Sequence, residues 1–390
     1  YSLKAFDTVK EAIRRLEERF DMMVIEGAGS PAEVNLKAND IVNMRIAKYL
    51  NAPVLLIADI DRGGALASLV GTLELLEPDE RALVKGLIIN KFRGDVTILQ
   101  PALDFLEEKT GKPVLGVIPY LPDLGIEDED SVSLDDKKTQ AKDKVNAPIK
   151  IAVIQTPKIS NFTDFDALSK EDDINLYYVK EGQEIGDADL ILLPGSKNTT
   201  EDMLYLRDSG MEKALNEAHE KNIPIIGICG GYQMLGEKIT DTDGVENGGS
   251  VRGMGLLPME TEFKTEKTRT IVNGVFENMT GTLKSLNGTE FEGYEIHMGE
   301  STILDSSEDD GFYGIVSTGR PFSVLSDGKE DGCVNGNVCG TYIHGIFDNE
   351  EFLLKLLKSI CERKGITYEA DNVISVKKRK EKEYDKLADM

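Results

Sequence analysis

The segment Gly227-Ile228-Cys229-Gly230-Gly231 has the residue types of a nucleophilic turn. It follows the apolar run 225–228 and precedes a helix-like run at 232–235, so Cys229 is expected at a strand-to-helix turn, G-x-C-x-G in the place of G-x-S-x-G. Glycines relieve the crowding of so sharp a turn, and the start of a helix stabilises a thiolate. The amide of Gly230 can donate to a developing oxyanion. A buried structural cysteine in a Gly-rich turn is the alternative that these residues leave open.

A nucleophilic cysteine needs a base, and the sequence holds three histidines. His219 lies in a charged helical segment and is expected to be exposed. His344 stands at the end of the predicted strand 340–344, before the last helix, and His297 lies in the Gly-containing segment 293–299. The residues alone leave a structural role open for both.

Apolar runs and helical spacing alternate along most of the chain. The expected strands of the first part are 22–25, 54–58, 86–89 and 114–118, with helices at 4–20, 39–50, 65–77 and 97–110. A second series follows with strands at 149–154, 176–179, 190–193 and 225–228. In the first part, near-continuous apolar strands between helices predict a parallel sheet buried on both faces, and the strand–helix series of both parts predicts α/β architecture. From residue 250 short strands with Gly turns are expected, 312–316 among them, before a helix at 350–363.

Residues 123–148 are rich in acidic residues and poor in apolar ones. This composition predicts a solvated linker, and a long surface loop of a single domain is the alternative. The expected domains are therefore 1–122 and 149–365, followed by a charged tail at 366–390.

Composition excludes several classes of protein. The chain has 390 residues, 45 Lys and Arg, 70 Asp and Glu, and a net charge of -25. Such an acidic surface argues against nucleic acid and anionic membranes as partners. No apolar run approaches the ~20 residues of a membrane span. Four cysteines in so long a chain do not make a disulfide framework, so we expect a reducing, cytoplasmic location.

Three segments resemble the motifs of a class I glutamine amidotransferase domain, in the family's order and spacing: 192–196, 227–233 and 340–345. The resemblance implies that Cys229 attacks the glutamine amide, that His344 is the base, and that amides at Gly195 and Gly230 form the oxyanion hole. Most such enzymes carry Glu two residues after the His, where this chain has Ile346. The cobalamin-pathway branch is similar in lacking it, and a Cys-His pair can work without a third member.

Four further segments resemble cobyric acid synthases: 24–36, 58–64, 90–95 and 159–166. The resemblance covers about residues 5–365. It implies glutamine- and ATP-dependent amidation of the peripheral carboxylates of adenosylcobyrinic acid a,c-diamide, which yields adenosylcobyric acid in cobalamin biosynthesis. ATP and Mg²⁺ are the implied cofactors, and glutamine and the diamide are the implied partners. We assign His297 to the acceptor side of the site.

The implied fold is an incomplete P-loop, dethiobiotin-synthetase-like parallel-sheet domain followed by a class I glutamine amidotransferase α/β domain. Glu26 ends an apolar run and opens a Gly-rich loop, where a carboxylate can reach a nucleotide-bound Mg²⁺. Asp59 ends the next strand, and Asn90 stands where P-loop proteins of this type contact the base. A plain strand-end acid is the alternative for both carboxylates.

No G-x-x-x-x-G-K-[ST] segment occurs in the sequence. The two Gly-Lys pairs, at Gly111 and Gly328, are followed by neither Ser nor Thr. The family carries its phosphate loop upstream of the segment matching Tyr1, so the sequence resembles an N-terminally truncated synthase. We expect the 390-residue chain to hydrolyse glutamine weakly at best and not to form the amidated product.

Two other interpretations compete with cobyric acid synthase. One is cobyrinic acid a,c-diamide synthase, an enzyme of the same build, against which segments 26–33 and 159–166 argue. The other is a catalytically silent scaffold with a degenerate amidotransferase fold. The absent phosphate loop favours the scaffold, and the presence of both Cys229 and His344 opposes it.

Overall fold

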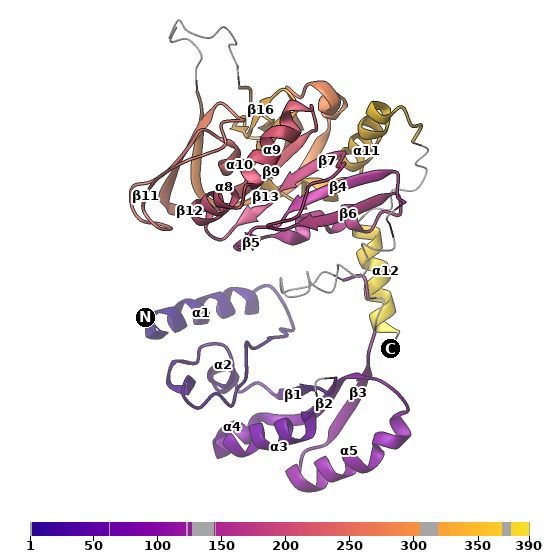
Figure 1. Ribbon diagram of the computed structural model, residues 1–390. Helices are drawn as coiled ribbons and strands as arrows, with labels where there is room; N and C mark the ends of the chain where they lie inside the picture. Colours follow the sequence, from indigo (N-terminus) through magenta and orange to yellow (C-terminus); the bar gives the residue numbers. More distant parts are fainter. Residues whose placement is uncertain are drawn as a thin grey trace, which may run out of the picture. The chain divides into compact units, whose positions relative to one another are not determined.

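The computed structural model describes residues 2–61, 63–121, 124–126, 144, 146–304, 319–368 and 376–389. The chain divides into two compact units, Tyr1–Leu124 and Gly125–Met390, each considered by itself (Figure 1). Within the described ranges no helix has the length and apolar character that a membrane span requires. The predicted linker 123–148 falls largely outside the described residues, and the predicted domain limits stay predictions.

The first unit contains a three-stranded parallel sheet in the order β1-β2-β3. Its strands are β1 (Val54–Asp59), β2 (Val84–Phe92) and β3 (Val114–Pro119). Its helices are α1 (Ser2–Glu17), α2 (Met44–Leu50), α3 (Ala65–Leu75), α4 (Pro78–Leu83) and α5 (Val96–Thr110). Asp95 caps α5 by accepting a hydrogen bond from the Thr97 amide at 2.8 Å, and Gly111 ends it in the left-handed conformation. The parallel α/β pattern predicted for this part is confirmed.

Two details of the first unit differ from the prediction. Residues 22–25 form no strand, and the Val24 side chain is 92% exposed. The sheet is also not buried on both faces: Leu87 and Ile89 pack under α3 and α5, whereas Leu55 and Ile57 on the other face are exposed. An apolar run fixes neither strand pairing nor the number of covered faces, because both depend on which elements pack against it.

The second unit is built on a six-stranded sheet in the order β16-β17-β9-β7-β4-β6. The strands are β4 (Ile149–Ile154), β6 (Ile174–Val179), β7 (Leu190–Leu193), β9 (Ile225–Ile228), β16 (Cys333–Asn335) and β17 (Val338–Thr341). All neighbours run parallel except the edge pair β16–β17. Parallel strands end at one edge of the sheet, so the loops after β7, β9 and β17 can meet there.

Both faces of this sheet are covered. Ile151 and Val153 of β4 face a core that includes α11 (Glu350–Lys364). Ala152 and Ile154 face the opposite core, formed with α8 (Thr199–Asp208), α9 (Met211–Glu220) and α10 (Gly230–Leu235). Figure 1 shows these three helices together on one side of the sheet. Alternate residues of each strand pack into two different cores. The sheet is therefore held on both faces, and this fixes the positions of the loops at its edge.

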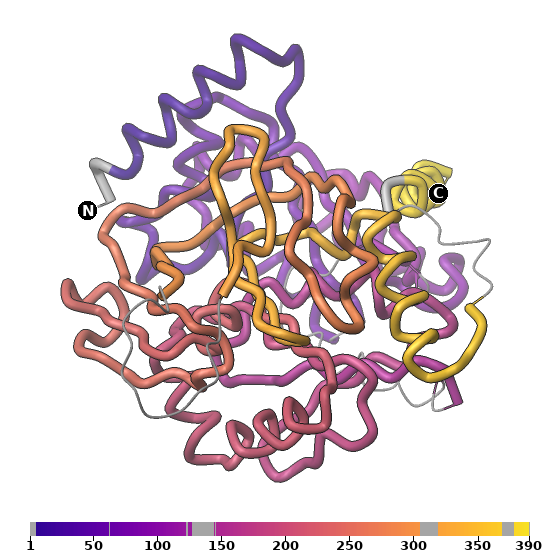
Figure 2. Tube along the Cα trace, turned by 90° about the horizontal axis from the view of Figure 1, so that it is seen from above, coloured from indigo at the N-terminus to yellow at the C-terminus, as the bar shows by residue number. Residues whose placement is uncertain are grey.

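A second sheet of seven strands packs beside the first. Its members are β10 (Lys238–Asp241), β11 (Gly249–Arg252), β12 (Met259–Phe276), β13 (Glu290–Ile303), β14 (Ser323–Leu325), β15 (Glu330–Asp331) and β18 (Ile343–His344). Figure 2 shows the orange and yellow segments that carry β12, β13 and the strands after residue 319 lying side by side. β12 and β13 are long rather than short, and the strand predicted at 312–316 lies outside the described residues.

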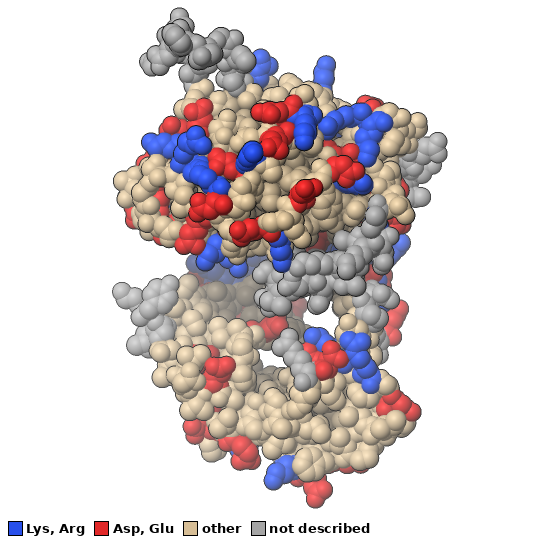
Figure 3. Space-filling model, in the orientation of Figure 1, with Lys and Arg blue, Asp and Glu red and all other residues tan. Residues whose placement is uncertain are grey.

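Smaller elements complete the second unit. They are β5 (Ile159–Ser160), β8 (Gly195–Ser196), α7 (Asp166–Ser169), α12 (Val376–Ala388) and the 3₁₀ turns η4 (Phe162–Phe165), η5 (Gly281–Leu286) and η6 (Ile346–Asp348). β5 pairs antiparallel with β8, which brings Ser160 opposite Gly195. Acidic and basic side chains are interspersed on the face of this unit that Figure 3 presents.

Candidate active site

Cys229 stands at a strained turn between β9 and α10. Its φ of 52° and ψ of -108° are unusual for a residue with a side chain and typical of a nucleophile elbow. Its amide donates a hydrogen bond of 2.8 Å to the carbonyl of Thr341, which ties the elbow to β17. Its Sγ lies 3.7 Å from the carbonyl oxygen of Ile296 on β13. The turn therefore presents the thiol at the edge where the two sheets meet.

Two glycines after the cysteine allow the elbow to pack against the turn that follows β7. A Cβ at Gly231 would lie 1.9 Å from the carbonyl oxygen of Leu193, and one at Gly230 would lie 2.8 Å from the amide nitrogen of Ser196. Neither position tolerates a side chain at such distances. The structure thus brings Gly230 beside Gly195–Ser196, the two segments predicted to supply the oxyanion donors.

His344 is held by a carboxylate that the sequence analysis did not assign. Its Nδ1 lies 2.7 Å from Oδ2 of Asp164, and both side chains are under 5% exposed. The other carboxylate oxygen of Asp164 accepts a hydrogen bond of 3.2 Å from the Gly345 amide. Within the described part of the chain, Nε2 of His344 is buried and makes no hydrogen bond. One ring nitrogen is therefore fixed, and the other is left for chemistry.

The environment of His344 favours its protonated form. Burial lowers the pKa of the imidazole and is the largest single influence, but the carboxylate of Asp164 and the thiol of Cys229 outweigh it and raise the pKa to about 10. The Cys229 thiol lies 3.7 Å from the carbonyl oxygen of Ile296, two residues along β13 from Tyr294, whose ring stacks on His344. A Cβ added at Gly195 would lie 3.7 Å from Cε1 of His344, so the oxyanion segment adjoins the same ring. Cys229, His344, Gly195 and Gly230 are thus brought together.

Asp164 contacts His344, whereas the residue that follows the histidine motif does not. Ile346, where most class I enzymes carry Glu, is buried in the core. Asp164 arrives instead from η4, 180 residues earlier, on a segment anchored by the β5–β8 pair. The one available signal was an acid between Phe162 and Phe165, both of which are buried. A carboxylate in such surroundings needs a partner, but its sequence neighbours do not identify which one.

The other two histidines are placed differently. The ring of His297 stacks on Tyr342 with centroids 3.8 Å apart, and its Nδ1 lies 2.7 Å from the Gly299 carbonyl oxygen. Burial is the main cause that lowers its pKa, which favours the neutral imidazole. His297 follows Ile296, whose carbonyl faces Cys229, but it takes no part in the Asp164–His344 pair. His219 lies on α9 and is half-buried rather than exposed as predicted.

In the first unit, Asp59 and Asn90 are neighbours at the ends of β1 and β2. The Asp59 carboxylate pairs with Lys91 Nζ at 2.7 Å, and the Asn90 side chain accepts a hydrogen bond from the Lys91 amide. Glu26 is exposed on the segment before α2 and is not part of this pair. The described residues contain no group of three or more His, Cys, Asp or Glu side chains able to hold a metal. The Asp59 carboxylate is thus engaged by a cation of the same unit.

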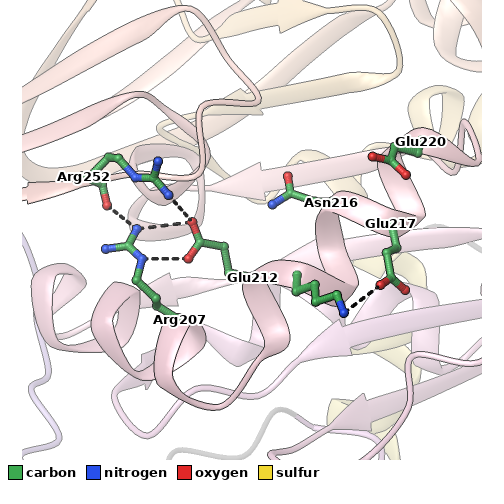
Figure 4. Close-up of a pocket in the computed structure, with 7 residues that line it drawn as sticks. Arg207, Glu212, Asn216, Glu217, Glu220 and Arg252 are labelled. Atoms are coloured by element: carbon green, nitrogen blue, oxygen red, sulfur yellow. Dashed lines mark hydrogen bonds and ion pairs between the residues drawn. The ribbon is translucent and has the colours of Figure 1, made fainter.

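The surface depression shown in Figure 4 contains none of the predicted site residues. Its volume is about 430 Å³, and it is lined by polar residues of α8, α9 and β11. Glu212 accepts from Arg207 at 2.7 Å and from Arg252 at 3.5 Å, so its charged groups already neutralise one another. This depression is a surface ion-pair cluster without a nucleophile.

Comparisons with known proteins agree with the geometry of the second unit. Residues 150–352 match the CobB/CobQ-like glutamine amidotransferase domain, and residues 3–128 match an AAA domain. A solved structure described as "Structure of PurLQS from Thermotoga maritima" is 20% identical, covers 55% of this chain and 99% of its own, and has a TM-score of 0.42. That value is too low to support an argument.

Relatives match nearly the whole chain. A cobyric acid synthase of Moorella thermoacetica is 51% identical over 94% of this chain and 70% of its own length. One from Desulfitobacterium hafniense is 47% identical over 100% of this chain and 74% of its own length. Identity at this level over both units shows common descent and a common fold, and the chain belongs to the cobyric acid synthase family.

Proposed function

We propose that the second unit hydrolyses glutamine at Cys229, with His344 as acid and base and Asp164 as the residue that orients His344. The observation that carries the proposal is the buried imidazole of His344. Its Nδ1 is fixed to Asp164, its Nε2 makes no hydrogen bond, and its ring adjoins the Gly195–Ser196 segment against which the Cys229 elbow packs. An imidazolium beside a cysteine favours the reactive thiolate over the thiol. Family membership supports the proposal, because it supplies glutamine-dependent amidation in cobalamin biosynthesis as the overall reaction.

The proposed reaction proceeds in two balanced steps. The thiolate attacks the side-chain carbonyl of glutamine, and the amides of Gly195 and Gly230 stabilise the oxyanion. The imidazolium of His344 protonates the departing nitrogen, which leaves as ammonia while a thioester forms. Water then attacks the thioester, His344 accepts its proton, and glutamate leaves as Cys229 returns to its thiolate. Glutamine and water are thus converted to glutamate and ammonia.

The ammonia serves the amide-forming half of the reaction. We infer that its acceptor is a peripheral carboxylate of adenosylcobyrinic acid a,c-diamide, activated with ATP, because hydroxide is a poor leaving group. Asp59 and Asn90, neighbours across β1 and β2, are the residues proposed for the nucleotide. Glu26, which lies on a separate exposed segment, is the residue proposed for Mg²⁺, which would neutralise phosphate charge. His297 on the acceptor side and a cytoplasmic location stay predictions.

Steady-state glutamine hydrolysis tests the proposal. The wild-type chain is expected to release glutamate, and Cys229→Ala is expected to release none above background. Cys361→Ala is the matched control, because this thiol is buried within the helix α11 and does not lie on a strand-to-helix elbow. Glutamate release by Cys229→Ala at the wild-type rate would refute the proposed nucleophile.

A further inference from the structure

The aromatic ring of Tyr294 lies against the buried imidazole of His344. Their ring centroids are 5.1 Å apart and the planes differ by 17°, which is a stacked arrangement. Tyr294 on β13 stands directly opposite His344 on β18 in the antiparallel register, so both side chains leave the sheet on the same face. The Tyr294 side chain is 38% exposed, whereas His344 is 1% exposed. The tyrosine ring is therefore the boundary between the imidazole and solvent on that side.

The residue before Tyr294, Gly293, allows β13 and β18 to approach each other closely. A Cβ at Gly293 would lie 2.5 Å from the carbonyl oxygen of His344 and 2.7 Å from Cγ2 of Ile343. Only glycine lets β13 come this close to β18. The stacking distance is thus set by the pairing of the two strands and not by a chance side-chain conformation.

The far end of Tyr294 is held by the segment that supplies Asp164. The side-chain amide of Asn161 donates a hydrogen bond to the Tyr294 hydroxyl at 3.2 Å. Asn161 has a φ of 51° and immediately precedes η4, the turn that contains Asp164. One short segment therefore contacts both groups that border the imidazole: its Nδ1 through Asp164, and its stacked face through Asn161 and Tyr294.

We propose that Tyr294 is a positioning residue of the glutaminase reaction, whose ring keeps the His344 imidazole in line between Asp164 and Cys229. Asn161 has a smaller part and orients the tyrosine. The proposal rests on the proposed function of Cys229 and His344. A stacked aromatic pair has a preferred geometry in addition to the surface that it buries. The stacked tyrosine therefore limits the rotation of the imidazole that the hydrogen bond to Asp164 would still permit. A misaligned imidazole would protonate the leaving nitrogen more slowly without weakening glutamine binding.

The test compares kcat and KM for glutamine hydrolysis in four variants. Tyr294→Ala is expected to lower kcat about three- to tenfold with KM within about twofold of wild type. Tyr294→Phe keeps the ring and is expected to retain kcat within about twofold. Asn161→Ala is expected to lower kcat by about twofold. Ile271→Ala is the matched control, because Ile271 is the other cross-strand neighbour of Tyr294, 79% exposed, and is expected to behave as wild type.

Several results would overturn the proposal. Wild-type kcat in Tyr294→Ala would show that the ring does not position His344. A rise in KM at unchanged kcat would make Tyr294 a glutamine-binding residue instead, and a loss in Tyr294→Phe equal to that in Tyr294→Ala would assign the effect to the hydroxyl. Tyr294→Leu, which keeps the bulk without the aromatic face, is expected to match Tyr294→Ala and replaces it if the alanine variant does not fold. Activity that persists in Cys229→Ala would instead refute the proposed function itself.

Discussion

The two units place their polar residues in opposite ways. In the second unit, Asp164 and His344 are almost fully buried, and their contact is fixed by two sheets and a strained turn. In the first unit, the side chains of Asp59 and Lys91 are 29% and 47% exposed, and their ion pair lies at an open edge of the sheet. An exposed ion pair contributes only about 0–1 kcal/mol, so its groups can exchange partners readily. The glutaminase site is thus organised before substrate arrives. At the edge of the first unit, by contrast, a bound nucleotide would first have to separate the existing ion pair.

The largest effect is expected for His344. His344→Asn removes the acid and base and should lower the rate of thioester formation by about 10²- to 10⁴-fold. His297→Asn is the matched control and should leave thioester formation near the wild-type rate, because His297 contacts Tyr342 and Gly299 and not Asp164. Rapid-quench measurement of the covalent intermediate separates the two variants. The reverse pattern would mean that the two histidines have exchanged roles.

Removing the buried carboxylate should have the next largest effect. Asp164→Asn is expected to lower kcat for glutamine hydrolysis by about 10²-fold, because the imidazolium loses the group that orients and stabilises it. Asp172→Asn is the control. Asp172 is an exposed acid that, like Asp164, precedes β6 in the sequence, so its replacement removes the same charge and should have no effect on kcat. Equal rates for the two variants would show that Asp164 is only a structural acid.

The same variant should also change the pH profile. The raised pKa of His344, about 10, keeps the imidazolium present at neutral pH and loses it as the pH rises through that value. Wild-type activity should therefore fall on the alkaline side near pH 10. Asp164→Asn removes a cause of the raised pKa, so its alkaline limb should move to lower pH. A shift to higher pH would contradict the assigned sign of the interaction.

The smallest effect on glutamine hydrolysis is expected in the first unit. Asp59→Asn should leave the glutaminase rate within about twofold of wild type, because Asp59 and its partner Lys91 belong to the first unit, whereas Cys229 and His344 belong to the second. We expect the same variant to weaken the binding of Mg·ATP in titration calorimetry. The control is Asp61→Asn, which removes an acid that pairs with Arg93 and should leave this binding unchanged. Unchanged nucleotide binding would remove Asp59 from the proposed site.

Local patterns predicted the strand-to-helix elbow and most strands, but not the contacts that cross the chain. The elbow at Cys229 could be predicted because an apolar strand, glycine and cysteine follow one another in a continuous stretch. The contact between Asp164 and His344 could not be predicted, because the two residues lie 180 positions apart in the sequence. The β5–β8 pairing that brings Asp164 near His344 has only two residues in each strand. The strand predicted at 22–25 was wrong for the related reason that apolar residues alone do not supply a strand partner.

The most direct test of the account is covalent labelling with 6-diazo-5-oxo-L-norleucine, a glutamine analogue that alkylates the nucleophile of glutaminase sites. Peptide mass spectrometry would locate the adduct, and the labelling rate would be compared between wild type and Asp164→Asn. We expect a single adduct on Cys229, formed at least about tenfold more slowly in Asp164→Asn, with Cys333, Cys339 and Cys361 unmodified. An adduct on another residue, or equal labelling rates in the two proteins, would contradict it.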